Sequence, residues 1–453
     1  MKSEKNFPFC KIEEKMCMRV KFLISFLVVF LAVQSAFAQD LQSKIDELIN
    51  TNPISQSAVV SLKVIDAKTQ NTYAQKGSSL LLHPASTMKV ATSAVVFSTL
   101  GRDYRLKTSL YAKDDILYLR LIGDPSLKSS DLAKLFKGVN LTKYHTLVID
   151  NTAIDNEFYD KGWMWNNLTS DDNPPYGIYN LNRNLISVKI VPDKKSGTVQ
   201  ILSEYPFYFV NNLTLGSTTC INADKAPWRD FKNPDAIYFS GSVASACVIN
   251  IAVQNPEDYF LSHLNKVMPG FCGRTCYGNI PSDSVLISEH QTPLMELLSE
   301  QNKKSNNLYA QTLFKIAAHE AYQTTGTFDN AIKLFNCFYG ESGMVVCDAS
   351  GLSHYNLLNC DFLCNILLKM APDRCFRSTL AESGKIGTLH NRLKDVNLQG
   401  KTGTIAGVSG LCGYLRAKSG DEYIFAILIQ NYKGKAKPAK ELEDSIVRAV
   451  NEY

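Results

Sequence analysis

Short stretches of alternating hydrophobic and polar residues dominate the middle of the chain, and helical spacing returns near its end. Alternation is typical of half-buried strands, whereas recurrence at every third or fourth position is typical of amphipathic helices. Helices are predicted over residues 90–100, 294–301, 307–322, 328–338 and about 439–451. Strands are predicted over residues 106–110, 117–121, 145–150, 185–191, 198–202, 236–240, 407–416 and 423–430.

The first 38 residues are expected to be an upstream extension of mixed charge, residues 1–17, followed by a secretory signal peptide. A basic start at Met18–Lys21 precedes an apolar run over Phe22–Val33, and Ala36–Ala38 has small residues at both positions that determine cleavage. The mature chain is therefore expected to begin at Gln39 and to be periplasmic. An uncleaved anchor is the alternative, although the apolar run is short for a membrane span.

Composition places the remainder among ordinary globular proteins. Hydrophobic residues make up 45% of the chain and charged residues 20%. The length allows two or three domains after the signal peptide. The net charge of +5 is small, so composition gives no argument for nucleic acid as a partner.

Ten cysteines follow the signal peptide. An even number in an exported protein favours disulfides, although their connectivity cannot be read from a sequence. Zinc is the rival interpretation, but clear histidine partners are missing near the closest cysteine pairs, so no metal is predicted. Local disulfides would fit at Cys220–Cys247, Cys272–Cys276 and Cys337–Cys347.

One serine in the chain is followed three positions later by a lysine, in Ser86-Thr87-Met88-Lys89. In a helix these positions share a face, so the Lys89 amine can reach the Ser86 hydroxyl and take its proton. Pro84 and the predicted helix that ends at Gly101 place Ser86 near the positive end of the helix dipole. Alone, this spacing is weak evidence of function.

Two later motifs strengthen the interpretation. Ser305-Asn306-Asn307 taken alone could cap a helix, and Lys401-Thr402-Gly403 could be a strand that enters a turn. In this order, however, the three motifs match the signature of serine β-lactamases and penicillin-binding proteins.

Acyl transfer gives each motif a role. Ser86 would be the nucleophile and Lys89 its general base, which requires a pKa well below ~10.4. Lys401 would lower that pKa as a second cation or attract the terminal carboxylate of the substrate. Ser305 would relay a proton to the leaving amine, and Asn307 would hold the acyl side chain or Lys89.

The strand that carries the third motif is expected to bind the substrate. Thr402, Gly403 and Thr404 are the candidate substrate-binding residues, and Gly403 would let a substrate backbone lie close to the strand. The backbone N–H groups of Ser86 and Thr404 would form the oxyanion hole.

Longer segments around these motifs resemble a known family. The chain is similar to the D-alanyl-D-alanine carboxypeptidases/endopeptidases of the low-molecular-mass class C penicillin-binding proteins. The resemblance covers nearly the whole mature chain, in order and in spacing. It is carried by Pro84–Lys89, Gly162–Trp165 with Tyr176 and Asn180–Asn184, Ser305–Leu308 with Ala310, Asp348–Ser353 with Asn356, and Gly387–Leu389 with Arg392 before Lys401.

The resemblance implies an α+β fold, with a transpeptidase-like antiparallel sheet flanked by helices. Residues 39–100 and 286–453 would form this catalytic domain, and residues 101–285 would be a β-rich inserted region. The implied activity is cleavage of D-Ala-D-Ala termini or cross-links of peptidoglycan stem peptides through an acyl-enzyme on Ser86. Stem peptides and β-lactams are the implied partners, and no cofactor is implied.

Some positions depart from the family pattern. Ala349, His354 and Ala406 replace the glycine, arginine and glutamine that are common there. These changes put the side-chain preference for the substrate in doubt and leave the acylation residues intact. Asp160 could bind a substrate amine, but a solvated loop carboxylate is the favoured interpretation.

Two other function classes stay open. A β-lactamase or esterase would use the same chemistry, but a β-lactamase needs a carboxylate for fast deacylation, and the sequence does not identify one. A non-catalytic peptidoglycan-binding protein is the other alternative, which loss of Ser86, Lys89 or Lys401 would have indicated; all three are present.

Overall fold

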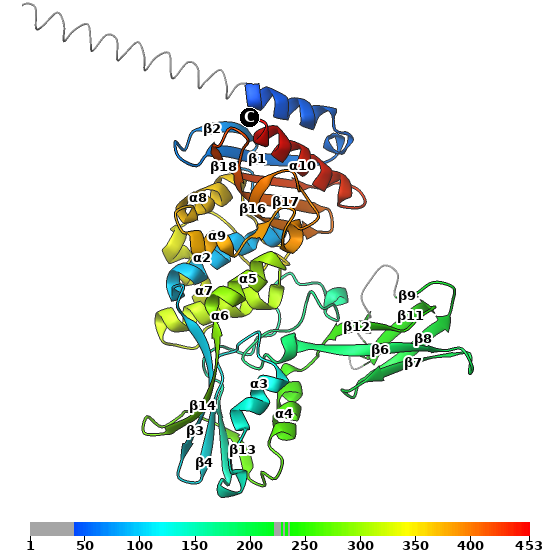
Figure 1. Ribbon diagram of the computed structural model, residues 1–453, viewed down its shortest axis with the longest axis vertical. Coiled ribbons are helices and arrows are strands. Elements are labelled where there is room, and N and C mark those ends of the chain that lie inside the picture. The colour runs from blue at the N-terminus through cyan, green and yellow to red at the C-terminus, as the bar shows by residue number, and fades with distance from the viewer. Residues whose placement is uncertain (1–39, 222–227, 230–231, 234–235) are drawn as a thin grey trace, which may run out of the picture.

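The computed structural model describes residues 40–221, 228–229, 232–233 and 236–453 (Figure 1). The predicted signal peptide lies outside the described residues. Within the described part of the chain, none of the helices is long and apolar enough to cross a membrane.

A six-stranded antiparallel sheet is built from both ends of the described chain, in the order β15-β16-β17-β18-β1-β2. The first strand pairs along its whole length with the last, which brings the two ends of the chain together. The strands are β1 (Val59–Asp66), β2 (Thr72–Lys76), β15 (Ala381–Glu382), β16 (Asn397–Ile405), β17 (Val408–Arg416) and β18 (Glu422–Gln430).

Each face of this sheet covers a separate hydrophobic core. Successive side chains of a strand point to opposite faces, so even-numbered residues of β18 such as Ala426 enter one core and odd-numbered ones such as Ile427 enter the other. The helix of residues 40–51 and α10 (Lys437–Asn451) cover the second core. Because both faces are covered, β17 and β18 are apolar at most positions.

The other face of the sheet packs on a group of helices. α2 (Met88–Leu100) is buried over most of its length and packs against α6 and α8. An antiparallel sheet flanked by helices confirms the α+β fold that the family resemblance implied. The remaining helices of this domain are α5 (Leu294–Lys303), α6 (Asn307–Tyr322), α7 (Phe328–Tyr339), α8 (Cys360–Met370) and α9 (Arg374–Ser378).

Between α2 and α5 the chain forms two inserted modules (Figure 1). The first module has a five-stranded sheet in the order β13-β5-β4-β3-β14 and two helices that pack together. Its elements are β3 (Arg105–Lys113), β4 (Ile116–Arg120), α3 (Ser129–Phe136), β5 (Thr146–Asp150), α4 (Pro256–Val267), β13 (Arg274–Tyr277) and β14 (Val285–Pro293).

The second module contains two small sheets. One has the order β12-β6-β7, and the other has the order β10-β11-β8 with β9 paired to β11. The strands are β6 (Leu185–Asp193), β7 (Thr198–Ser203), β8 (Tyr208–Leu215), β9 (Cys220–Ile221), β10 (Trp228–Arg229), β11 (Ala236–Val243) and β12 (Cys247–Ala252).

The return from the insert to the catalytic domain lies at β14. This strand begins at Val285, the last residue of the predicted insert, and pairs with β3 as far as Pro293. The chain therefore leaves the sheet of the first module at Pro293, and α5 begins at Leu294.

The predicted disulfides are not present, because all ten cysteines of the described residues are free. Cys220 and Cys247 begin strands of different sheets, and Cys337 lies on α7 while Cys347 lies in the loop beyond it. Cys272-x3-Cys276 is likewise unpaired. Export and an even count do not report whether two Cα atoms come within the roughly 7 Å that a disulfide can bridge.

Candidate active site

The Ser86 motif forms the tight turn that opens α2. Residues Ala85–Thr87 make one turn of 3-10 helix and Met88 begins the α-helix, so Ser86 and Lys89 lie on one face as predicted. The Lys89 Nζ atom lies 3.0 Å from the Ser86 Oγ atom. Ala85 adopts a left-handed conformation, with φ of 44°, which turns the chain into the helix.

The Lys89 amine is fully buried and has three oxygen neighbours. Besides Ser86, it contacts the Asn307 Oδ1 atom at 2.5 Å and the Ser350 carbonyl oxygen at 2.7 Å. A neutral amine can donate to two of these oxygens and accept from the third. Since both Asn307 Oδ1 and the Ser350 carbonyl can only accept, the Ser86 hydroxyl is the group that can donate to Lys89.

Electrostatics favours the neutral form of Lys89. Burial first, and the charge of Lys401 second, hold the pKa of Lys89 well below its ordinary value, although Asp348 and Asp172 act in the opposite direction. Lys401 is also fully buried, and burial lowers its pKa to about 7. Lys401 was predicted either to lower the pKa of Lys89 as a second cation or to attract the substrate carboxylate. In both roles it is a group that titrates near neutrality.

The second and third motifs meet beside this pair. The Lys401 Nζ atom donates to the Ser305 Oγ atom at 2.9 Å and to the Thr402 carbonyl at 2.7 Å. Ser305 is left-handed, with φ of 61°, and directly precedes the cap of α6, whose first residue is Asn307. Of the two roles open for Asn307, the geometry has it holding Lys89.

The candidate substrate-binding strand is β16. Thr402 is buried and its hydroxyl donates to that of Thr388, whereas Thr404 is exposed. At Gly403, a Cβ atom would lie 2.9 Å from the Pro84 carbonyl oxygen and 3.0 Å from the Ser86 nitrogen. The glycine thus lets the turn that carries Ser86 approach the strand, and the predicted approach of a substrate backbone stays a prediction.

The carboxylate of Asp348, which the sequence motifs do not single out, organises the loop beside Lys89. Asp348 is fully buried, and its carboxylate accepts six hydrogen bonds. These bonds fix the loop that presents the Ser350 carbonyl to Lys89. The donors are the backbone N–H groups of Ser350, Gly351 and Ser353, the Ser350 hydroxyl, the Asn356 amide and the Trp163 indole.

The inserted region reaches the active site at two points. The Trp163 indole donates to Asp348 at 2.9 Å, and the Asn307 amide donates to the Asp172 carbonyl at 2.8 Å. Both Trp163 and Asp172 belong to the loop between β5 and β6. The residues that hold Lys89 are therefore themselves held by the insert.

Asp160 is not a solvated loop carboxylate, contrary to the favoured interpretation. Its Oδ2 atom is buried. Burial and the nearby charge of Asp348 raise the pKa of Asp160 to about 7, and the Lys315 ammonium acts in the opposite direction. Lys315 itself lies over the ring of Tyr176, 4.5 Å from its centroid.

Comparison with known proteins gives a consistent result. The D-Ala-D-Ala carboxypeptidase 3 (S13) family profile matches residues 41–453. The chain is 24% identical to the D-alanyl-D-alanine carboxypeptidase DacB of Haemophilus influenzae, over 83% of this chain and 88% of that protein. It is 26% identical to a D-alanyl-D-alanine carboxypeptidase of Actinomadura sp., over 91% and 85%.

The fold comparison agrees. The crystal structure of penicillin binding protein 4 (dacB) from H. influenzae superimposes with a TM-score of 0.77 at 22% identity, and covers 90% of this chain and 99% of that one. A complex of the same protein with a β-lactam gives a TM-score of 0.71 at 20% identity, with the same coverage.

Proposed function

The chain belongs to the D-Ala-D-Ala carboxypeptidase 3 (S13) family, and we propose that Ser86 is the nucleophile of its peptidase reaction. The family assignment makes the chain a D-Ala-D-Ala carboxypeptidase that acts on peptidoglycan. The observation that carries the proposal is the Lys89 amine, buried and bonded to the Ser86 hydroxyl at 3.0 Å.

In the acylation step, the Ser86 hydroxyl oxygen attacks the carbonyl carbon of the penultimate D-alanine. The hydroxyl proton passes to the neutral amine of Lys89, and the bond to the terminal D-alanine breaks. The leaving amine receives, through the Ser305 hydroxyl, the proton that Lys89 had accepted, while the Lys401 ammonium holds Ser305 in place by a 2.9 Å hydrogen bond. Water then hydrolyses the ester, which releases the shortened peptide and restores the Ser86 hydroxyl.

Substrate binding is proposed for β16. The Lys401 ammonium attracts the terminal carboxylate together with Thr402, and the backbone N–H groups of Ser86 and Thr404 stabilise the oxyanion. A β-lactam carries a carboxylate next to an acyl group, so it would occupy the same positions. A relative of the same fold has been crystallised with a β-lactam, which supports this extension.

We further propose export to the periplasm through cleavage after Ala38. The basic start, the apolar run and the small residues at the cleavage site support this address. Amino-terminal sequencing of the protein purified from cells should begin at Gln39. A purified chain that retains the apolar run would contradict cleavage.

Fluorescent-penicillin labelling of the purified protein tests the nucleophile. The unmodified chain should give a persistent band that Ser86→Ala abolishes, while Ser98→Ala, an exposed serine on the same helix, keeps it. A band that survives in Ser86→Ala would refute the assignment. Rapid repeated turnover of a chromogenic β-lactam would instead favour the β-lactamase alternative.

A further inference from the structure

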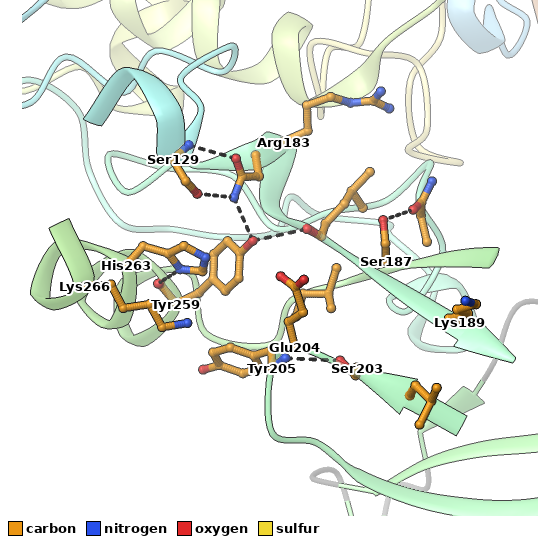
Figure 2. A pocket seen from close by; sticks show the side chains of 15 residues that line it. Ser129, Arg183, Ser187, Lys189, Ser203, Glu204, Tyr205, Tyr259, His263 and Lys266 are labelled. Atoms are coloured by element: carbon orange, nitrogen blue, oxygen red, sulfur yellow. Dashed lines mark hydrogen bonds between the residues drawn. The ribbon is translucent and has the colours of Figure 1, made fainter. Parts of the chain in front are cut away.

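A groove with a volume of about 850 Å³ lies between the two inserted modules, and none of the proposed catalytic residues lines it (Figure 2). One wall is α4 of the first module, where Tyr259, His263 and Lys266 recur at helical spacing. The other wall is β6 and the end of β7, which contribute Lys189 and Glu204. The two modules thus share one concave surface, the inter-module groove.

The inter-module groove is positively charged. Arg183, Lys189 and Lys266 line it and are exposed, whereas Glu204 is its one lining carboxylate among the described residues. Within the described part of the chain, none of these three cations forms an ion pair or a side-chain hydrogen bond. Unneutralised cations that line one concavity attract an anionic ligand.

Arg183 is held at this groove by a strained backbone. Asn182, Arg183 and Asn184 are all left-handed, with φ of 50°, 62° and 53°. Such a conformation costs a non-glycine residue ~1–2 kcal/mol, so three in succession persist only where neighbours enforce them.

The two flanking asparagines provide that enforcement. The Asn182 amide donates to the Ser129 hydroxyl and the Tyr259 hydroxyl, at 2.7 Å and 3.0 Å. The buried Asn184 amide donates to the Pro175 carbonyl at 2.9 Å and accepts from a backbone N–H group at 3.0 Å. Only the Arg183 side chain is left to project from the turn (Figure 2).

Arg183 also connects the groove to the active site. The charges of Lys89 and Arg183 both lower the pKa of Asp172, against the raising effect of its burial, so both cations lie close enough to Asp172 to act on its charge. The Asp172 carbonyl in turn accepts the hydrogen bond from Asn307. Arg183 is therefore the groove cation that lies near the loop bonded to Asn307.

We propose that the inter-module groove binds a second stem peptide of the same peptidoglycan strand, through its carboxylates, while the first stem peptide occupies the active site. Lys189 and Lys266 lie on opposite walls of the groove. The proposal rests on the peptidoglycan activity proposed above. It gives the inserted modules a role in selecting polymer over isolated peptide.

The first test compares two substrates: a soluble fragment with two stem peptides and a short acyl-D-Ala-D-Ala peptide that cannot span to the groove. For Lys189→Gln/Lys266→Gln, KM for the two-stem fragment should rise about tenfold, as expected for losing two modest charge pairs. The value of kcat and the kinetics on the short peptide should stay as in the unmodified chain. The difference should vanish in 1 M salt, where the Debye length is ~3 Å.

Lys44→Gln is the matched control, because Lys44 is an exposed lysine on the helix of residues 40–51, at the opposite end of the molecule (Figure 1). Arg183→Gln should raise the same KM. An unchanged KM in a double variant that still labels with penicillin would overturn the groove proposal. Failure of the unmodified chain to label or to cleave the short peptide would instead count against the proposed function.

A binding experiment tests the groove proposal separately from the proposed peptidase function. Fluorescence anisotropy with Ser86→Ala as the background measures affinity for the two-stem fragment without turnover. Weaker binding after the Lys189 and Lys266 substitutions supports the proposal, and equal binding refutes it. A glycerol-phosphate polymer that competes better than the two-stem fragment would refute the peptide as the ligand.

Discussion

Replacing Asp348 by asparagine should lower both the stability of the protein and the rate of penicillin labelling, because Asp348 holds the loop beside Lys89. The substitution keeps the shape of the side chain and changes one carboxylate oxygen into an N–H donor. The Oδ1 atom serves three donors and the Oδ2 atom serves the other three. If the amide keeps its oxygen at the first set, its NH₂ group meets the Ser353 N–H, the Trp163 indole N–H and the Ser350 hydroxyl.

The magnitude follows from what happens to those three donors. The Ser350 hydroxyl can rotate and accept, but the Ser353 and Trp163 N–H groups cannot. Each buried donor left without an acceptor costs ~1–3 kcal/mol, so Asp348→Asn should lose about 2–6 kcal/mol of stability. No cavity contribution is added, because the two side chains have nearly the same volume.

Activity should fall with stability, because the same loop presents the Ser350 carbonyl to Lys89 at 2.7 Å. Urea unfolding followed by circular dichroism measures the stability, and the rate of fluorescent-penicillin labelling measures the activity. Asp361→Asn is the control. It breaks a partly exposed ion pair with Lys63 and should cost at most about 1 kcal/mol, with labelling unchanged.

Two outcomes would refute this reasoning. If Asp348→Asn and Asp361→Asn unfolded at the same urea concentration, the six hydrogen bonds would not be worth what their burial indicates. If Asp348→Asn were less stable but labelled at the unmodified rate, the loop would not position Lys89.

Two further predictions concern pH and the nucleophile turn. For substrates with a free carboxylate, kcat/KM should rise with pH as Lys89 loses its proton, and should fall again above about 7 as Lys401 loses its own. An amidated substrate should lack the alkaline fall, and a fall of equal size with both substrates would contradict the carboxylate-binding role. Gly403→Ala should slow penicillin labelling at least tenfold, because its Cβ would lie 3.0 Å from the Ser86 nitrogen. Gly278→Ala, whose Cβ would meet only the tip of a valine side chain at 3.3 Å, is its control; equal labelling rates would refute the packing argument.

Much of the fold could be predicted from local patterns. The predicted helices over 307–322 and 328–338 correspond to α6 (Asn307–Tyr322) and α7 (Phe328–Tyr339). β8 was missed because Asn211 and Asn212 interrupt its apolar pattern. β14 was missed because its apolar residues Val285–Ile287 are exposed at a sheet edge, which a reading based on burial does not expect.

Some residues of the candidate site could also be predicted from local patterns, and others could not. Ser86, Lys89, Ser305 and Lys401 could be found because each lies in a short motif whose spacing brings the reactive groups together. The Ser350 carbonyl could not, because a backbone acceptor leaves no mark on residue type.

The roles of Trp163 and Asp172 were hidden for a different reason. They depend on loops that contact Asp348 and Asn307 across long separations in sequence, and no period or spacing encodes such contacts. This bears on what the insert is for. A separate accessory domain would leave the hydrogen-bond network of the base complete without it. Here the insert supplies a donor to Asp348 and an acceptor to Asn307, so the geometry of Lys89 depends on the insert being docked. A ligand that bridges the inter-module groove and the active site would act on that same loop, which is why substrate selection and catalysis are expected to be coupled in this protein.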